Sequence, residues 1–320
     1  MKTQMKTLIT GGRGFIGVNL IQLLAQSRDL RILDNLERCS TTGWNDGIVD
    51  FSQKNIVDSS SLKPSFDQVD NVVHLAAYGS VIESIRDPNS NFAVNVQGTL
   101  NVLQASVDAG VRRLVFASTG GALIGDATPP VDENSLPKPI SPYGASKLCG
   151  EAYCHAFAKS YRIETVCLRF GNVYGPHSAH KKGAVTTFIK ALMKDEPIVI
   201  FGDGSASRDY VYVADLCAGI AAALDAQIKG ANVFHLASGR ETTVLELANI
   251  LRRIAGKPNH PIEFRPARIG EVVRNFAQYG KAAEILGFHP HTVLEDGLEK
   301  TFRWFEENRA VVLDANESDS

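Results

Sequence analysis

The segment Thr7-Leu8-Ile9-Thr10-Gly11-Gly12-Arg13-Gly14-Phe15-Ile16-Gly17 decides the fold of this 320-residue chain. Its first four residues predict a short buried strand, and apolar residues at helical spacing follow the glycines. Glycines spaced G-x-x-G-x-x-G between a strand and a helix let the backbone approach a pyrophosphate at the positive end of the helix. The segment therefore predicts a dinucleotide-binding turn at the start of a parallel sheet.

A second predicted strand, residues 30–33, ends in an acidic residue, Asp34. It lies about 20 residues after the glycine turn, where an acid can accept both hydroxyls of a ribose. A carboxylate there would repel a 2'-phosphate, so Asp34 favours NAD over NADP. Arg38, just past this strand, could instead serve a 2'-phosphate and is the reservation against that assignment.

Short apolar strands alternate with amphipathic helices up to about residue 170, which is typical of parallel βαβ units. We predict an α/β chain with a Rossmann-like doubly wound parallel sheet in residues 1–170, completed by about 211–240, and a smaller C-terminal α/β substrate domain in 171–320. The predicted strands of the first part are residues 7–10, 30–34, 71–75, 113–117 and 165–168, with a weak one near 48–50, and its long helices are 95–108 and 143–159.

The alternation breaks down after Pro176. The smaller domain is expected to hold a helix at 183–194, a strand at 197–201, a proline-bearing run at 259–268 and a final helix at 294–308. Residues 211–224 and a strand at 232–236 would return to the first sheet, as they do in the family that the motifs described below resemble. The polar, acidic tail 314–320 is expected to be disordered.

Composition narrows the setting in which the protein works. The 33 basic and 35 acidic side chains leave a formal charge of -2, so no global field draws the chain to nucleic acid or to an anionic membrane. Five cysteines without a C-x-x-C pair argue against zinc and against a disulfide framework. No signal-type run opens the chain, and no apolar stretch reaches the roughly 18 residues of a membrane span. We therefore expect a cytoplasmic protein without metal.

The stretch Tyr143-Gly144-Ala145-Ser146-Lys147 sets a phenol and an ammonium four residues apart. On a helix these two side chains share one face. Tyrosine alone is a poor base because its unperturbed pKa is about 10. A fixed cation beside it stabilises the phenolate, so we expect Lys147 to lower the pKa of Tyr143 and to make it a general base.

Joined to the glycine turn, these residues resemble the extended short-chain dehydrogenase/reductases, in their UDP-glucose 4-epimerase-like nucleotide-sugar epimerase/dehydratase branch. The resemblance spans nearly the whole chain. It implies tightly bound NAD, a UDP-sugar substrate and a homodimer whose four-helix bundle is built by the two long helices; the alternative, that both helices simply pack on the sheet, stays open. The further motifs that carry it are His74-Leu75-Ala76-Ala77, Asn95-Val96-Gln97-Gly98-Thr99, Ser118-Thr119, Arg169-Phe170-Gly171-Asn172-Val173-Tyr174-Gly175-Pro176, the run from Phe201 to Val213, and Arg268-Ile269-Gly270-Glu271.

The resemblance also implies roles for individual residues. Thr119 would hydrogen-bond the reacting sugar oxygen, Tyr143 would be the acid/base and Lys147 would reach the nicotinamide ribose, with Ser118 a weaker catalytic candidate. The implied cofactor contacts are Gly11, Gly14, Phe15, Ile16, Gly17, Asp34, Asn35, Asn55, Ile56, Leu75, Ala76, Ala77, Asn95, Tyr143, Lys147 and Phe170. The implied substrate contacts are Thr119, Asn172, Arg208, Arg268 and Asn275, the two arginines gripping the diphosphate as guanidinium groups do.

Two glycines, Gly120 and Gly121, stand directly after Thr119. Relatives that eliminate water carry an acidic pair there, because elimination needs an additional base and acid. Their absence argues against a 4,6-dehydratase and against a decarboxylase with a glutamate at this place. We therefore expect NAD-dependent epimerisation at C4 of a nucleotide sugar through a 4-keto intermediate. The alternatives are a 4-keto-sugar reductase and a non-catalytic sensor of NAD or nucleotide sugar.

Two departures from the family pattern leave the sugar open. Ile124 replaces the usual tyrosine before Gly125, and Asn275, at the position that gates sugar size, is neither a bulky aromatic nor the smallest alternative. A hexose, an N-acetylhexosamine or a uronic acid would each remain possible. The stretch His177-Ser178-Ala179-His180-Lys181-Lys182 could be read as a metal or carboxylate site, although such loops are more often solvated.

Overall fold

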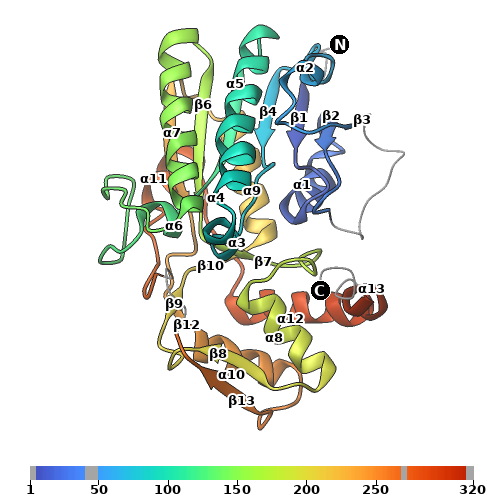
Figure 1. The fold of residues 1–320 in the computed structure, drawn as a ribbon, viewed down its shortest axis with the longest axis vertical. Coiled ribbons are helices and arrows are strands. Elements are labelled where there is room, and N and C mark those ends of the chain that lie inside the picture. The colour runs from blue at the N-terminus through green and yellow to red at the C-terminus, as the bar shows by residue number, and fades with distance from the viewer. Residues whose placement is uncertain (1–4, 40–49, 268–271, 315–320) are drawn as a thin grey trace.

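The computed structural model describes residues 5–39, 50–267 and 272–314. One seven-stranded sheet dominates the molecule, with strand order β11-β6-β5-β4-β1-β2-β3 and every neighbouring pair parallel (Figure 1). Its strands are β1 (Lys6–Thr10), β2 (Asp29–Asp34), β3 (Asp50–Gln53), β4 (Asn71–His74), β5 (Arg113–Thr119), β6 (Glu164–Phe170) and β11 (Ala231–Leu236). The chain runs outward from β1 to β3 and then reverses through β4, so the predicted doubly wound sheet is confirmed.

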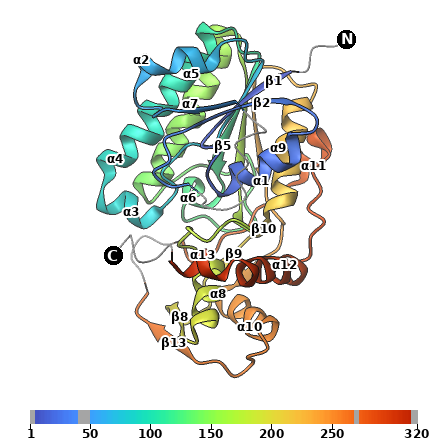
Figure 2. The same cartoon turned by 90° about the vertical axis from the view of Figure 1, so that its right-hand side faces the viewer.

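Helices cover both faces of this sheet, which explains why its central strands, β4, β5 and β6, are buried along nearly their whole length (Figure 2). On one face α1 (Phe15–Leu24), α9 (Val213–Asp225) and α11 (Gly280–Leu286) pack over a core that includes Ile9 and Val115. On the other face α5 (Gly98–Asp108) and α7 (Pro142–Tyr161) contribute to a second core. Alternate residues of each strand thus enter alternate cores.

Helix α7 carries the tyrosine–lysine pair and has well-defined ends. Ser141 caps its start by accepting a hydrogen bond from the Gly144 amide at 3.2 Å, and Pro142 occupies the first turn. Arg162 ends it in the left-handed conformation. The helix predicted at 95–108 is instead preceded by α4 (Pro88–Phe92) and opens with a π-helical segment, η2 (Ala93–Gln97).

A smaller region lies beyond the carboxyl ends of the strands (Figure 1). Its core joins α8 (Ala184–Lys194), α10 (Val244–Ile254), α12 (Leu294–Glu307) and α13 (Arg309–Asp314) with β8 (Ile198–Phe201), which pairs in parallel with β13 (Ile262–Arg265). Two short strand pairs connect the regions: β7 (Asn172–Tyr174) with β10 (Tyr210–Tyr212), and β9 (Ser207–Arg208) with β12 (Thr242–Thr243). The remaining short helices are α2 (Ser59–Leu62), η1 (Lys63–Phe66), α3 (Val81–Arg86) and α6 (Gly121–Ile124).

Some boundaries differ from the expectation. The chain returns to the first region through α9 and β11, as predicted, and returns again through α11, where Ala282, Leu286 and Phe288 join the core beside α9. The predicted weak strand is described only from Asp50 onward, because residues 48–49 lie outside the described residues. Asp314 ends α13, and the remainder of the predicted disordered tail, 315–320, also lies outside them.

Candidate functional site

The glycine turn lets two strand ends approach one another closely. Gly11 has a φ of +69°, and a Cβ there would lie 2.6 Å from the Ala76 amide nitrogen. A Cβ on Gly17 would lie 2.5 Å from the Gly12 carbonyl oxygen, so this glycine allows α1 to pack against the turn. The start of α1 therefore lies at the carboxyl edge of the sheet, where a helix N-terminus favours an anionic group.

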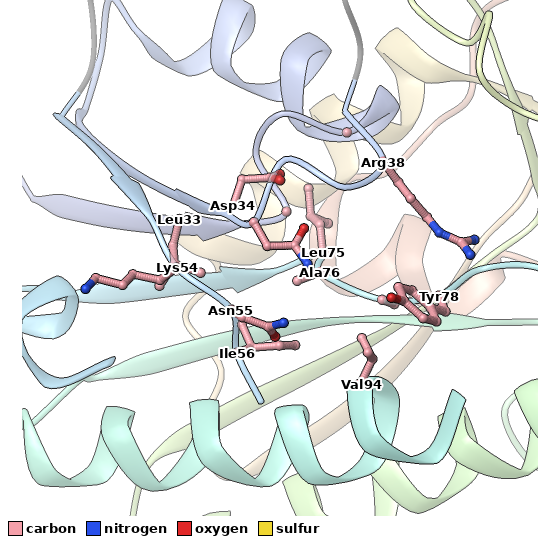
Figure 3. Close-up of a pocket in the computed structure, with 14 residues that line it drawn as sticks. Leu33, Asp34, Arg38, Lys54, Asn55, Ile56, Leu75, Ala76, Tyr78 and Val94 are labelled. Atoms are coloured by element: carbon pink, nitrogen blue, oxygen red, sulfur yellow. The ribbon is translucent and has the colours of Figure 1, made fainter. Parts of the chain in front are cut away.

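One pocket at this edge gathers most of the predicted cofactor contacts (Figure 3). Its walls come from the ends of β1, β2 and β4 and from the segment after β3. The predicted residues among its lining are Gly11, Gly14, Asp34, Asn35, Asn55, Ile56, Leu75, Ala76 and Ala77. Sequence reasoning missed Leu33, Lys54, Tyr78 and Val94. Val94 had no signal to reveal it, because it enters the pocket from the π-helical segment η2.

Asp34 and Arg38, the two charged residues that bear on the choice between NAD and NADP, are both held in place by contacts with other residues. The Asp34 carboxylate accepts hydrogen bonds from the amides of Arg13 at 2.9 Å and Leu36 at 2.8 Å, which hold it at the end of β2. Arg38 also lines the pocket, but its guanidinium pairs with Glu83 at 2.5 Å and lies 4.2 Å from the centre of the Tyr78 ring. The reservation raised by Arg38 is weakened, because its charge is already paired.

Seven other predicted cofactor contacts lie outside the pocket lining, and two of them, Tyr143 and Lys147, are described in the next paragraph. Phe15 and Phe170 belong to the apolar core, Ile16 packs against it and Gly17 supports the turn. Asn95 is buried, accepts a hydrogen bond from the Tyr78 amide at 2.8 Å and donates one to the Ser146 hydroxyl at 3.0 Å. It thereby ties the segment after β4 to α7, so its observed contacts support the wall of the pocket.

Thr119, Tyr143 and Lys147 come together where β5 ends and α7 begins. The Thr119 side chain forms a hydrogen bond with that of Tyr143. The Lys147 ammonium donates to the Ala117 carbonyl at 2.8 Å and lies 6.0 Å from the centre of the Tyr143 ring. The three side chains predicted to do the chemistry are therefore neighbours at the carboxyl edge of the sheet.

The pKa values of the pair are shifted by burial. Surrounding protein raises the pKa of Tyr143 to about 12, and the hydrogen bond with Thr119 acts in the opposite direction. Burial lowers the pKa of Lys147 to about 8, while Cys154 and Glu151 act to raise it. The expectation that Lys147 lowers the pKa of Tyr143 is wrong for this structure, because the ammonium is held at the Ala117 carbonyl and desolvation dominates.

Ser118 has a different environment from Thr119. Successive side chains alternate along a strand, and the Ser118 hydroxyl donates to the Glu151 carboxylate at 2.6 Å. Ser118 is also buried. Its hydroxyl is thus bonded to Glu151 inside the protein, on the opposite side of β5 from the Thr119 side chain, and its catalytic role stays a prediction.

The space beside Gly120 and Gly121 is filled by side chains from distant segments. A Cβ on Gly121 would lie 2.4 Å from Nδ2 of Asn275, and one on Gly120 would lie 3.3 Å from Nδ1 of His235. The backbone N–H of Asn275 donates to the Ser207 carbonyl at 3.2 Å, which holds this residue beside Gly121. Ile124, which replaces the usual tyrosine, is fully buried in a small apolar cluster.

The other predicted substrate contacts lie on the short strands that connect the two regions. Arg208 is half-buried on β9, and its guanidinium donates to the Ser207 carbonyl at 2.8 Å. Asn172 is exposed on β7, with its amide bonded to the Asp209 carbonyl at 2.6 Å. Arg268 lies outside the described residues. Arg208 and Asn275 are thus brought to one side of the site through Ser207.

The histidine- and lysine-rich loop contacts the first region, where the Lys182 ammonium pairs with Glu83 at 3.0 Å. Within residues 5–39, 50–267 and 272–314, no group of three or more His, Cys, Asp or Glu side chains could hold a metal ion. Among the same residues, no helix has both the length and the apolar character that a membrane crossing requires.

Comparisons with known proteins give one consistent family. The model of the NAD dependent epimerase/dehydratase family matches residues 7–237. A UDP-glucose 4-epimerase from Mycolicibacterium smegmatis is 36% identical over 323 residues, covering 94% of this chain and 98% of that protein. The structure of Thermotoga maritima UDP-glucose 4-epimerase with UDP-glucose matches with a TM-score of 0.91 at 35% identity, covering 95% of this chain and 100% of that one.

A further solved structure, Thermus thermophilus UDP-glucose 4-epimerase in complex with NAD, matches with a TM-score of 0.88 at 33% identity. The match covers 94% of this chain and 99% of that one. The family model spans the glycine turn, Asp34 and the Tyr143–Lys147 pair. Together with the doubly wound sheet, these matches show that the chain belongs to the NAD dependent epimerase/dehydratase family.

Proposed function

We propose that the protein is an NAD-dependent 4-epimerase of UDP-sugars. The observation that carries the proposal is the meeting of Thr119, Tyr143 and Lys147 at the edge that holds the Asp34 pocket, beside two glycines that supply no further acid or base. One acid/base and one hydride carrier are sufficient for inversion at C4, and elimination would need more.

The pocket fits a dinucleotide on its own geometry. Gly11 and Gly14 line the pocket at the start of α1, where a pyrophosphate would bind, and the fixed Asp34 carboxylate would accept the ribose hydroxyls. Lys147 would reach the nicotinamide ribose. When bound, NAD supplies the hydride acceptor and donor that oxidation and reduction at C4 require.

Tyr143 would move the proton in both half-reactions. It takes the proton of the C4 hydroxyl as that carbon is oxidised, and it returns the same proton after the 4-keto sugar has turned its other face. Thr119 would orient the reacting oxygen. Burial raises the pKa of Tyr143 to about 12, so positive charge beside the phenol would have to offset that effect for Tyr143 to accept a proton. The Lys147 ammonium, 6.0 Å from the centre of the ring, is the nearby cation. Because burial lowers the pKa of Lys147 to about 8, its charge is present mainly below that pH.

The glycines and their neighbours also argue against dehydration. His235 is fully buried beside Gly120, and burial lowers its pKa to about 4, so it is neutral near pH 7. Asn275, beside Gly121, carries a neutral amide that acts neither as an acid nor as a base near neutral pH. Neither side chain supplies the acid that elimination of water across C5 and C6 requires.

The nucleotide should be anchored while the sugar is held loosely, because the sugar must turn between the two half-reactions. We assign the anchor to Arg208, with Arg268 and Asn172 as further ligands of the UDP moiety. Guanidinium groups suit the task because they pair with phosphate oxygens in a planar fork. The half-buried position of Arg208 beside Ser207 supports this assignment.

We also propose that a second copy of the chain packs on the face formed by α3, α4 and α7. Large apolar side chains are exposed there: Ile85 at 48%, Phe92 at 60%, Tyr153 at 37% and Tyr161 at 51%. Pairing of this face with its copy would bury these side chains against the same three helices of the second copy.

The test is turnover without added cofactor. Purified protein would be incubated with UDP-glucose, UDP-N-acetylglucosamine and UDP-glucuronate, and the products separated by epimer. The C4 epimer of at least one sugar should form without net consumption of NAD. Tyr143→Phe should lower turnover by roughly 10²-fold or more while keeping bound NAD and the melting temperature. Stoichiometric use of NADH or NADPH would instead identify a keto-sugar reductase, and binding without turnover of any sugar would identify a sensor.

A further inference from the structure

A row of buried polar side chains crosses three neighbouring strands beneath the Tyr143 site. Ser118 on β5 is the register partner of Arg169 on β6, and Arg169 is the register partner of His235 on β11. All three are buried. Side chains that are level on neighbouring parallel strands point to the same face of the sheet, and here that face is covered by α7. The proposed chemistry uses none of them.

Glu151 of α7 binds this row to the helix. Its carboxylate accepts from the Ser118 hydroxyl at 2.6 Å, from Arg169 Nε at 3.0 Å and from Arg169 Nη2 at 2.9 Å. The carboxylate and guanidinium side chains are only 7% and 5% exposed. A bidentate, charge-assisted pair of this kind fixes direction as well as distance.

Glu151 lies on the same face of α7 as the tyrosine–lysine pair, so its bonds to Ser118 and Arg169 bear on the position of that pair. Tyr143, Lys147 and Glu151 follow one another at intervals of four residues, so they lie on one face of α7. Thr119, which meets Tyr143, is the residue next to Ser118, which meets Glu151. A rotation of α7 that displaced the tyrosine from Thr119 would also break the bonds of Glu151.

We propose that Glu151, held by Arg169 and Ser118, is the positioning residue of this site: it sets the rotation of α7 that brings Tyr143 to Thr119 and fixes the helix face that carries Lys147 one turn away. The proposal rests on the acid/base role proposed for Tyr143.

The charges around Lys147 favour an electrostatic part in this role. Burial lowers the pKa of Lys147, and Cys154 and Glu151 oppose that effect. β5 presents the Phe116 ring, 4.9 Å from the ammonium, and the Ala117 carbonyl. The titratable groups that interact with Lys147 are Tyr143, Glu151 and Cys154 from α7 and His74 from β4. Glu151 is the one carboxylate in this described set.

The first test is Glu151→Gln, which keeps the shape and removes the charge. We expect kcat to fall about tenfold at pH 8 with little change in KM, and the alkaline limb of the kcat profile to move to lower pH by about one unit, since a nearby opposite charge shifts a pKa by that order. An NMR titration of the Lys147 ε-carbon, assigned by its loss in Lys147→Met, should show the same downward shift directly.

Glu164→Gln is the matched control. Glu164 pairs at 2.8 Å with the buried Arg113 on the same two strands, β5 and β6, but at their opposite ends. Each substitution leaves a buried arginine without its carboxylate and should lower the melting temperature. Only Glu151→Gln should move the pH limb and the Lys147 titration.

A second variant keeps the test decisive if the uncompensated Arg169 prevents Glu151→Gln from folding. Glu151→Met combined with Arg169→Met replaces the ion pair with apolar side chains, an exchange that buried pairs often tolerate. We expect this protein to fold and retain NAD, with a reduced kcat and a lowered Lys147 titration. Parent values of kcat, pH limb and Lys147 titration in the variants that fold would overturn the proposal and leave Glu151 a structural residue. A fully active Tyr143→Phe would instead overturn the proposed function itself.

Discussion

Acidification between pH 7 and pH 5 should destabilise the fold through two buried histidines. His74 is 1% exposed, with its ring nitrogens 2.7 Å from the Thr10 hydroxyl and 3.0 Å from the Thr99 hydroxyl. Burial, aided by the Lys147 ammonium, lowers the pKa of His74 to about 3. Burial, aided by Arg169, lowers the pKa of His235 to about 4. Both side chains are therefore neutral in the native state at pH 5.

The sign and size of the effect follow from proton linkage. Histidine in the unfolded chain titrates near 6.5. Below that pH the unfolded state therefore binds protons at these two residues, whereas the native state stays unprotonated there until the pH approaches about 4. The free energy of unfolding then falls as the pH falls, from about 6.5 down to the native pKa values. At pH 5 each buried histidine should lower the free energy of unfolding by about 2 kcal/mol, and the two together by about 4 kcal/mol.

Urea unfolding at pH 5, 6 and 7 measures this loss. His74→Gln and His235→Asn should each reduce the change in unfolding free energy between pH 7 and pH 5 by about 2 kcal/mol, whatever they do to stability at pH 7. His291→Gln is the control, because His291 is exposed, and it should leave the pH dependence of the parent unchanged. If His74→Gln and His235→Asn also keep the parent's pH dependence, these histidines are protonated in the native state and the burial argument is wrong.

Three further outcomes are expected. Asp34→Ala should weaken NAD far more than NADP in calorimetry, because only NAD offers a free 2'-hydroxyl to the carboxylate; equal losses would contradict the pairing. Arg208→Ala should weaken UDP and the UDP-sugar by the same one to two decades, about 1.5 to 3 kcal/mol, with NAD content constant, and unchanged UDP affinity would place the nucleotide elsewhere. Phe92→Asp should convert a dimer to a monomer in sedimentation, whereas Phe264→Asp, on the exposed β13, should not; a monomeric parent would refute the proposed interface.

Much of the fold could be predicted because it is encoded locally. Buried parallel strands are rich in apolar residues, so β1, β5 and β6 could be located from their short apolar runs, whereas the return of the strand near residue 232 to the same sheet was expected from the family resemblance. The return of α11 to the first region could not be predicted. Its short helix has no feature that distinguishes packing on the first sheet from packing on the smaller core.

The candidate site likewise has some residues that the sequence predicts and others that only the packed structure reveals. Motif spacing and the family resemblance predicted Thr119, Tyr143 and Lys147, which the structure brings together, and nine of the residues that line the pocket. They missed Glu151 and Arg169, which are ordinary charged residues in the sequence and become a buried pair only when α7 lies on β6. They also gave the wrong direction for the pKa of Tyr143, because that shift depends on desolvation by the folded protein.

The sequence by itself determined the order of strands and helices, the glycine turn and the tyrosine–lysine spacing, because each depends on side-chain periodicity over a few residues. Only the tertiary structure decided that Asn275 lies beside Gly121 and that His235 lies beside Gly120. In each case the two residues are more than 100 positions apart in the chain. The tertiary structure also decided which buried groups are charged. Burial and the field of neighbouring charges are properties of the packed chain, and they set the pKa values on which the chemistry depends.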